Sequence, residues 1–171
     1  MKKTILIIAL MFTALSASAQ MKLAHVNSQQ LLDTMSSYKK AQDSLAQKNV
    51  EIRNELIEMQ NAYTKKITDY EEQKSTMKAF QLKNEEESIM RLEEAIRIRQ
   101  GTGQQELQDL NDKLTVPIMN RIREAVAIVS KKEKLDYVFD GPLMIYFNNE
   151  LDITKKVLIE LLRLDAEAMK K

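Results

Sequence analysis

Apolar residues recur every seven positions through most of the chain, from about Gln29 to Leu114. The first stretch carries two such series, offset by four residues: Tyr38, Leu45, Ile52, Met59 and Phe80 on one, and Leu56, Tyr63, Tyr70 and Met77 on the other. The second stretch has Ile89, Ile96 and Leu110 on one series and Leu107 and Leu114 on the other. Paired series of this kind form the seam of a coiled coil. Two stretches of similar length predict a helical hairpin whose arms pack against each other.

The turn of this hairpin is predicted near residues 75–84, where Ser75, Thr76 and Asn84 are weak helix formers. Gly101 and Gly103 are the alternative, but a turn there would leave arms of very unequal length. We interpret the two glycines as a kink or soft spot in the returning arm. A helix over residues 36–75 would be roughly 60 Å long at 1.5 Å per residue. Polar residues interrupt the seam, so the arms are predicted to open readily over roughly residues 60–105.

The segments on either side of the hairpin have shorter patterns. Residues 22–27 (KLAHVN) predict a brief strand. Pro117 is predicted to interrupt the returning helix and Thr115 to cap its restart. The restarted helix has an apolar face that would pack on a small body, formed by Ile118, Ile122, Ala125 and Val129.

The last third of the chain predicts a β-hairpin and a final helix. Residues 137–139 and 143–147 are apolar and aromatic runs around Asp140, Gly141 and Pro142, a pattern typical of two strands and a turn. Asp152 or Thr154 is the expected helix cap. The apolar side of that helix is expected to contain Val157, Leu158, Leu161, Leu162 and Leu164.

The first residues have the features of an export signal. Lys2 and Lys3 precede an apolar run over residues 5–15, and Ala17 and Ala19 give the small-residue pattern that a signal peptidase needs. The run is too short for a permanent membrane span. We therefore expect cleavage after Ala19 and a mature protein outside the inner membrane, with no transmembrane segment.

Composition excludes several classes of function. The chain has one His, no Cys and three Gly, which argues against the usual Cys and His ligand sets of zinc sites, thiol nucleophiles and phosphate-binding loops. No catalytic site, metal site or cofactor is therefore expected. Without its two leader lysines the chain has 24 Lys and Arg against 25 Asp and Glu, so bulk charge indicates no nucleic-acid partner. The single histidine, His25, is interpreted as an ordinary packed or surface residue rather than a pH sensor.

Apolar residues near the predicted tip are the candidates for a binding surface. Met and Tyr side chains make adaptable contacts with exposed apolar segments of other proteins. Alternatively, the same residues only close the hairpin seam. Met77 and Phe80 are expected in the seam, and Leu82 or Met90 is expected to be more exposed. The full candidate set is Tyr63, Tyr70, Met77, Phe80, Leu82, Ile89 and Met90.

Three segments resemble the Skp/OmpH family of periplasmic chaperones: KLAHVNSQQLL, LTVPIMNRIREAVAIVSKKEKLDYVFD and DITKKVLIELL. The order of these segments around a long charged hairpin carries the resemblance. It implies a mainly α fold with a small β part, in which an antiparallel coiled-coil hairpin (a tentacle) projects from a β-body formed by subunit association. The implied domains are a signal peptide (1–19), the N-terminal strand and start of the body (20–35), the tentacle (36–115), and the rest of the body (116–171).

The resemblance also implies a function. It implies a homotrimer in the periplasm whose tentacles enclose unfolded outer-membrane proteins and keep them soluble without ATP. The implied subunit interface consists of Leu23, Val26, Val138, Phe139, Ile145 and Phe147. The best-known member has strongly basic tentacles, but residues 36–130 here carry 15 Lys and Arg against 16 Asp and Glu. Contact with lipopolysaccharide or acidic membrane surfaces is therefore not expected from the tentacles. The alternative function is a structural or adaptor coiled-coil protein of the cell envelope.

Overall fold

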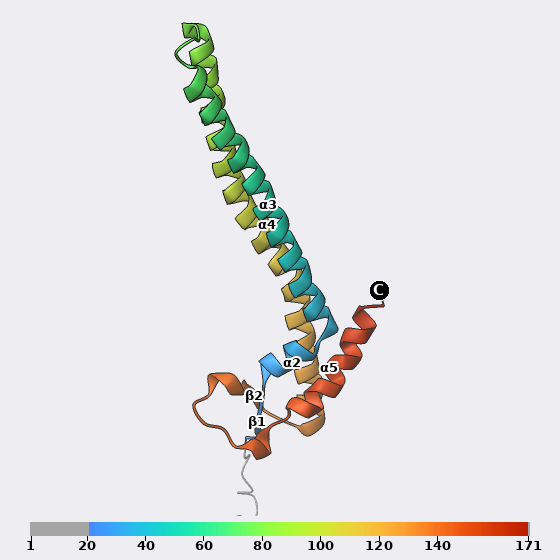
Figure 1. Cartoon of the computed structure of the whole chain (residues 1–171). Helices are drawn as coiled ribbons and strands as arrows, with labels where there is room; N and C mark the ends of the chain where they lie inside the picture. Colours follow the sequence, from blue (N-terminus) through green and yellow to red (C-terminus); the bar gives the residue numbers. More distant parts are fainter. Residues whose placement is uncertain (1–20, 171) are drawn as a thin grey trace, which may run out of the picture. The chain divides into compact units, whose positions relative to one another are not determined.

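The computed structural model describes residues 21–170, and these form two compact units (Figure 1). Residues 33–121 form the hairpin unit, and residues 21–32 with 122–170 form the terminal unit. The predicted signal peptide lies outside the described residues. The two units are described separately below.

The hairpin unit contains two long helices that lie side by side (Figure 1). Helix α3, Ser36–Gln73, has 38 residues, and the returning helix α4, Ala79–Glu133, has 55. Five residues connect them, so the predicted turn is confirmed at the start of its range. The amide N–H and the hydroxyl of Thr76 both donate hydrogen bonds to the carbonyl of Gln73. This side-chain competition with helical hydrogen bonds explains why a turn without Gly or Pro forms here.

Seam residues in the middle of the hairpin are buried, whereas those towards the turn are not. Ile52 on α3 and Ile96 and Gly103 on α4 are buried. From residue 53 to residue 95 no residue is fully buried, and the seam side chains there are half-buried. The arms therefore pack more loosely towards the turn, as the polar seam positions indicated.

Helix α4 is longer than the sequence indicated. It continues through both Gly101 and Gly103 and through Pro117, so the prediction that Pro117 interrupts the helix is wrong. The hydroxyl of Thr115 donates to the carbonyl of Asn111 at 2.7 Å, as an interior helix residue does, and caps nothing. Proline inside a helix costs about 3 kcal/mol. Burial of Ile118 and Ile122 immediately after it offsets that cost, which local propensity could not reveal.

The terminal unit contains a two-stranded parallel sheet. Strand β1, Leu23–Val26, pairs with β2, Tyr137–Asp140, with Leu23 opposite Tyr137 and Val26 opposite Asp140. A short helix, α2, Ser28–Thr34, follows β1. Two turns of 3-10 helix, Gly141–Leu143 and Asn149–Leu151, follow β2, and helix α5, Thr154–Ala168, ends the chain.

The predicted β-hairpin around Gly141 does not form in the terminal unit. After β2 the backbone N–H of Met144 bonds to the carbonyl of Gly141, which turns the chain into a 3-10 helix that begins with Gly141 and Pro142. The hydrogen bonds of β2 are made instead with β1, more than a hundred residues earlier. Residues 144–148 are therefore not a strand in the described structure.

Polar side chains connect the sheet to the helices that follow the strands. The Asp140 carboxylate accepts hydrogen bonds from the N–H and hydroxyl of Ser28, at the first turn of α2. The Asp152 carboxylate accepts from the N–H of Thr154 at 2.7 Å, but Ile153 occupies the N-cap position of α5, so the prediction that Asp152 or Thr154 caps this helix is wrong. The Thr154 hydroxyl in turn accepts from the N–H of Asn27 at 2.9 Å. The buried apolar residues beneath are Ala24, Val26, Leu31, Ile122, Ala125, Val129, Ile153, Val157 and Leu161.

Candidate functional site

Exposed apolar side chains on the hairpin unit are the first candidate surface. Of the seven predicted residues, Phe80 is 74% exposed and Met90 is 58% exposed. The other five are half-buried: Tyr63, Tyr70, Met77, Leu82 and Ile89. The prediction that Phe80 lies in the seam is wrong, because the turn before Ala79 resets the helical register and the series of α3 does not continue into α4. Val50, Ile57 and Ile98 are also exposed, and sequence reasoning had not selected them.

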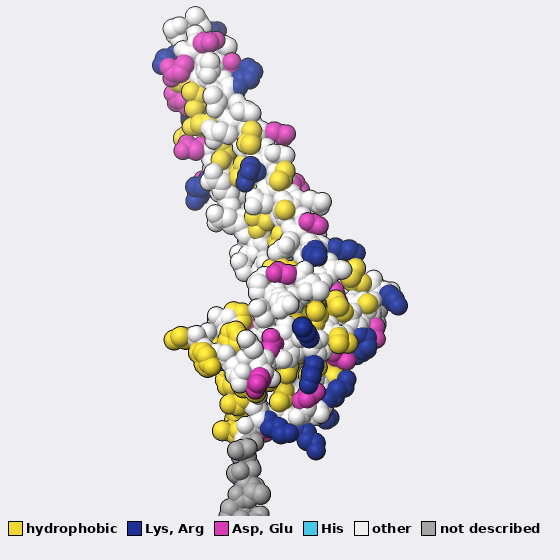
Figure 2. Space-filling view, turned by 60° about the horizontal axis from the view of Figure 1, so that its bottom comes forward, with side chains coloured by type: hydrophobic (Ala, Val, Ile, Leu, Met, Phe, Trp, Pro, Cys, Tyr) yellow, Lys and Arg dark blue, Asp and Glu magenta, His cyan; other side chains and the backbone are white. Residues whose placement is uncertain are grey.

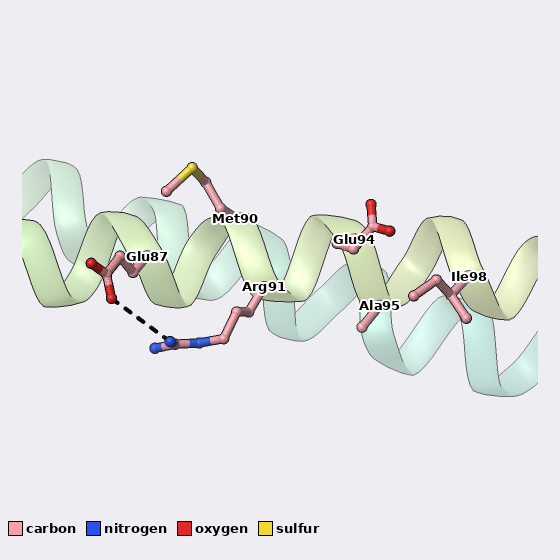
Figure 3. Close-up of a pocket in the computed structure, with 6 residues that line it drawn as sticks. All are labelled: Glu87, Met90, Arg91, Glu94, Ala95 and Ile98. Carbon is pink, nitrogen blue, oxygen red and sulfur yellow. Dashed lines mark ion pairs between the residues drawn. The ribbon is translucent and has the colours of Figure 1, made fainter.

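Two shallow depressions share Met90. The first lies along α4 and is lined by Glu87, Met90, Arg91, Glu94, Ala95 and Ile98 (Figure 3). Figure 3 shows Glu87 and Arg91 facing each other as an ion pair, with 3.8 Å between carboxylate oxygen and guanidinium nitrogen. The second lies between the arms and is lined by Ile67, Tyr70, Glu71, Glu86, Ile89 and Met90. Met90 therefore connects apolar surface on α4 with apolar surface that both arms contribute.

The charges around these depressions are mostly paired. Arg97 makes two hydrogen bonds to the Glu94 carboxylate, at 2.8 and 2.5 Å, and these lower the pKa of Glu94. The Tyr70 hydroxyl donates to Glu86 at 2.7 Å, which raises the pKa of Tyr70. Paired charges have short-range fields, so the depressions present apolar contact area more than net charge.

A polar network joins the two arms near their middle. Glu106 on α4 lies 3.0 Å from the Lys48 ammonium and 2.9 Å from the Arg99 guanidinium, and Arg99 also contacts Glu55 on α3 at 2.5 Å. The hydrogen bond from Lys48 is the main reason that the pKa of Glu106 lies below its ordinary value, although desolvation opposes it. The network lies beside the buried Ile52 and Gly103 and reinforces the tightest part of the hairpin.

Exposed aromatic and aliphatic side chains on the terminal unit are the second candidate surface. Figure 2 shows hydrophobic side chains projecting from one side of this unit. Four of the six predicted interface residues are exposed: Leu23, Phe139, Ile145 and Phe147. Tyr137, Leu143, Tyr146 and Leu151 join them and had not been selected. The run of five apolar residues from Leu143 to Phe147 was the signal that could have identified two of these.

The remaining two predicted interface residues are less accessible. Val138 is half-buried, and Val26 is only 5% exposed because the core of its own unit covers it. The inclusion of Val26 is therefore wrong for a direct contact with another chain. Burial alternates along β2, but three successive residues of β1, Ala24 to Val26, are all buried, so alternation alone could not identify the inward side chains.

A cleft in the terminal unit lies between the strands and the segment after β2. Its apolar lining comes from Leu23, Ala24, Phe139, Met144, Tyr146, Phe147 and Leu151. His25 is buried at its base, with Nε2 3.0 Å from the Asn148 carbonyl and its ring centroid 4.3 Å from that of Phe147. His25 is thus a packed residue, in agreement with the sequence interpretation.

The described residues assemble no recognisable reaction chemistry. Between residues 21 and 170 no group of three or more His, Cys, Asp or Glu side chains could hold a metal ion. In the same part of the chain no helix has the length and hydropathy needed to cross a membrane. What the surface offers is apolar contact area on both units.

Comparison with known proteins adds independent information. The family model for outer membrane protein (OmpH-like) matches residues 22–161. The chaperone protein Skp of Pectobacterium atrosepticum is 30% identical over 105 residues, which covers 61% of this chain and 64% of the relative. The chain therefore matches a little under two thirds of the length of that relative.

A solved structure shares the fold. The crystal structure of an OmpH-like protein from Caulobacter crescentus, described as an outer membrane chaperone, superposes with a TM-score of 0.73 at 16% identity and covers 88% of each chain. This likeness confirms the predicted class, mainly helical with a long hairpin and a small sheet. The family match also agrees with the expectation of a non-enzymatic protein. Because the family model spans most of the chain, from the first strand into the last helix, the chain belongs to the Skp/OmpH family of OmpH-like outer membrane proteins.

Proposed function

We propose that this protein is an ATP-independent holding chaperone of the periplasm that binds unfolded outer-membrane proteins and prevents their aggregation. One observation carries the proposal: the hairpin leaves large apolar side chains exposed along both arms, including Ile57, Phe80, Met90 and Ile98. A rod built only as a spacer gains nothing from such exposure, whereas a protein that captures apolar segments of unfolded chains needs it. The Skp relative, itself called a chaperone, supports the same function.

Binding would be passive and distributed. Each exposed side chain offers a weak contact worth at most about 1.5–3 kcal/mol when fully buried. Several weak contacts on one arm, repeated on the arms of other subunits, hold a chain firmly while each contact exchanges quickly. Release then needs no ATP, because the apolar segments of the client become buried when it folds.

The proposed assembly is a homotrimer that forms through the terminal units. Strand β2 has one sheet neighbour among the described residues, β1, so its other edge is free for a further strand. Met144 and Asn148 have extended backbone conformations, and Ile145 between them is fully exposed. Residues 144–148 of one copy would add to the edge of β2 in a neighbouring copy, which covers both the edge and the apolar side chains.

Light scattering of the mature protein with and without a urea-denatured outer-membrane porin tests both the proposed assembly and the proposed binding of clients. We expect the mass of a trimer alone, and a soluble complex of defined mass when the denatured porin is diluted into it. Ile145→Asp should lower the mass to that of a folded monomer, because a charge would replace an apolar contact between copies. Ile57→Asp, an equally simple change on α3, should leave the assembly intact.

The outcomes separate this function from the alternative. A trimer that leaves the porin to aggregate would support a structural or adaptor coiled-coil protein. A folded monomer at micromolar concentration would overturn the proposed assembly.

A further inference from the structure

Helix α5 has a second apolar seam, on the side that faces away from the core. Val157 and Leu161 on its inner side are fully buried. On the opposite side Ile159 is 75% exposed, and Leu162, which the sequence pattern had assigned to the buried side, is 41% exposed. Ala166 and Met169 continue this outer line and are exposed as well.

The spacing of the outer residues is that of a coiled-coil seam. Ile159, Leu162, Ala166 and Met169 follow one another at intervals of three, four and three residues. At 3.6 residues per turn they cover a stripe roughly 80° wide. A stripe this narrow suits contact with one other helix, whereas helices that lie in a bilayer surface have a broad apolar face with aromatic residues. The fifteen residues of α5 include no aromatic side chain.

A row of basic residues flanks the seam. Lys156, Arg163 and Lys170 are seven residues apart, on the position next to the outer stripe, and Lys155 lies at its N-terminal end. Arg163 is paired with Glu160 and Glu167, both at 2.6 Å, and Lys156 with Glu133 at 2.8 Å. Lys155 and Lys170 make no salt bridge within the described residues. Figure 2 shows hydrophobic side chains bordered by Lys and Arg on this unit.

The lysines at the start of α5 are not explained by helix stability. The first turn contains Lys155 and Lys156 and no acidic residue. Positive charge at a helix N-terminus opposes the helix dipole. The ion pair with Glu133 compensates Lys156, but Lys155 has no salt bridge within the described residues, and a partner with negative charge would supply one.

We propose that the outer face of α5 docks an amphipathic helix of a partner protein, with an apolar seam on that helix and acidic residues beside it. The apolar stripe supplies the contact area, and the basic row selects the partner and sets its orientation. Two heptads make a small interface, so the docking is weak and reversible. This surface shares no residue with the exposed apolar residues of the hairpin or with residues 144–148.

Two synthetic helices test the proposal with the full mature chain. Both have about three heptads with Leu at the seam positions; one carries Glu beside the seam and the other Lys. Fluorescence anisotropy should show at least about tenfold tighter binding of the acidic peptide. Ile159→Ser with Leu162→Ser should weaken its binding at least about fivefold. Val50→Ser with Ile57→Ser, two exposed apolar residues on α3, is the matched control and should leave binding of the acidic peptide unchanged.

A charge variant keeps the test decisive if the apolar variant loses helix content. Lys155→Glu with Lys170→Glu should reverse the preference between the two peptides, and the first of these changes also places a negative charge at the positive N-terminal end of the α5 dipole. Equal affinity for both peptides, or an unchanged preference in the charge variant, would overturn the proposal. Binding of phosphatidylglycerol vesicles, lost in the same variants while neither peptide binds, would assign the surface to lipid instead. Porin holding should be normal in the α5 variants, because they alter none of the exposed hairpin residues proposed to bind clients, so its loss would concern the proposed function alone.

Discussion

Two glycines in α4, Gly101 and Gly103, have different surroundings, and this determines whether an added methyl group would stabilise or strain the hairpin. A Cβ on Gly101 would meet nothing within 4 Å, whereas a Cβ on Gly103 would lie 2.7 Å from Cγ2 of Ile52. Ile52 is β-branched and stiff, so it cannot swing away. Gly101→Ala should stabilise the hairpin by about 1 kcal/mol. Gly103→Ala brings the same gain in helix propensity, but overpacking against Ile52 should cost about 1–3 kcal/mol and cancel it. Urea unfolding of both variants measures the difference, and equal stabilisation would contradict this packing.

The Glu106 network makes the hairpin sensitive to acid. Hydrogen bonding from Lys48 holds the pKa of Glu106 below its ordinary value of 4.5. A lowered folded-state pKa means that the contribution of Glu106 to stability is present above about pH 4.5 and is lost as pH falls through the folded value. The melting temperature should therefore decline from pH 6 to pH 3, and the decline should be shallower in Glu106→Gln. An identical pH profile in the variant would show that other carboxylates determine the decline.

At the scale of the elements, the two arms should open unevenly. Ile52, Ile96 and Gly103 hold the middle of the hairpin, and no residue from 53 to 95 is fully buried. Hydrogen exchange should be fast over roughly residues 60–95 and slower around Ile52 and Ile96. This range is narrower than the 60–105 that the polar seam positions and the glycines predicted, because Gly103 is a site of close packing against Ile52. Uniform protection along both arms would contradict the uneven seam.

Periodicity was sufficient for the hairpin because its contacts repeat every seven residues along each arm. It gave the seam, the turn and the apolar face of α4 that includes Ile122 and Val129. It failed at Phe80, since a register does not continue across a turn. The strand predicted over residues 137–139 is confirmed as β2, but its predicted partner was wrong, because β1 lies more than a hundred residues earlier, beyond the reach of any local pattern. The exposed side of α5 was not predicted, because Leu162 directly follows Leu161, which lies on the inner face, and the two read as one apolar run.

At the scale of the whole molecule, charge is balanced while apolar surface is unevenly distributed. The arms carry 15 Lys and Arg against 16 Asp and Glu, and many of these groups form ion pairs along or between the helices. Apart from the outer stripe of α5, the exposed apolar side chains gather on the hairpin and at residues 143–147. A protein arranged in this way can self-associate through one surface and still leave the other free for clients.

The last prediction concerns what holds an unfolded client. Nearly cancelling charges give little long-range attraction, and about 0.15 M salt screens what remains beyond roughly 8 Å. Raising salt from about 0.05 to 0.5 M should therefore change the affinity for a denatured porin little. Phe80→Ser with Met90→Ser should weaken it several-fold and keep the oligomer intact, because both side chains are exposed and neither supports the seam. Leu82 is half-buried, so its replacement would also loosen the packing of the hairpin. A loss of client binding could then not be distinguished from a loss of hairpin stability. Titration of a labelled porin at both salt concentrations measures the contributions of charge and of apolar contact to the affinity. A steep loss of binding with salt would assign the affinity to charge. Full binding by the double variant would place the client on another surface.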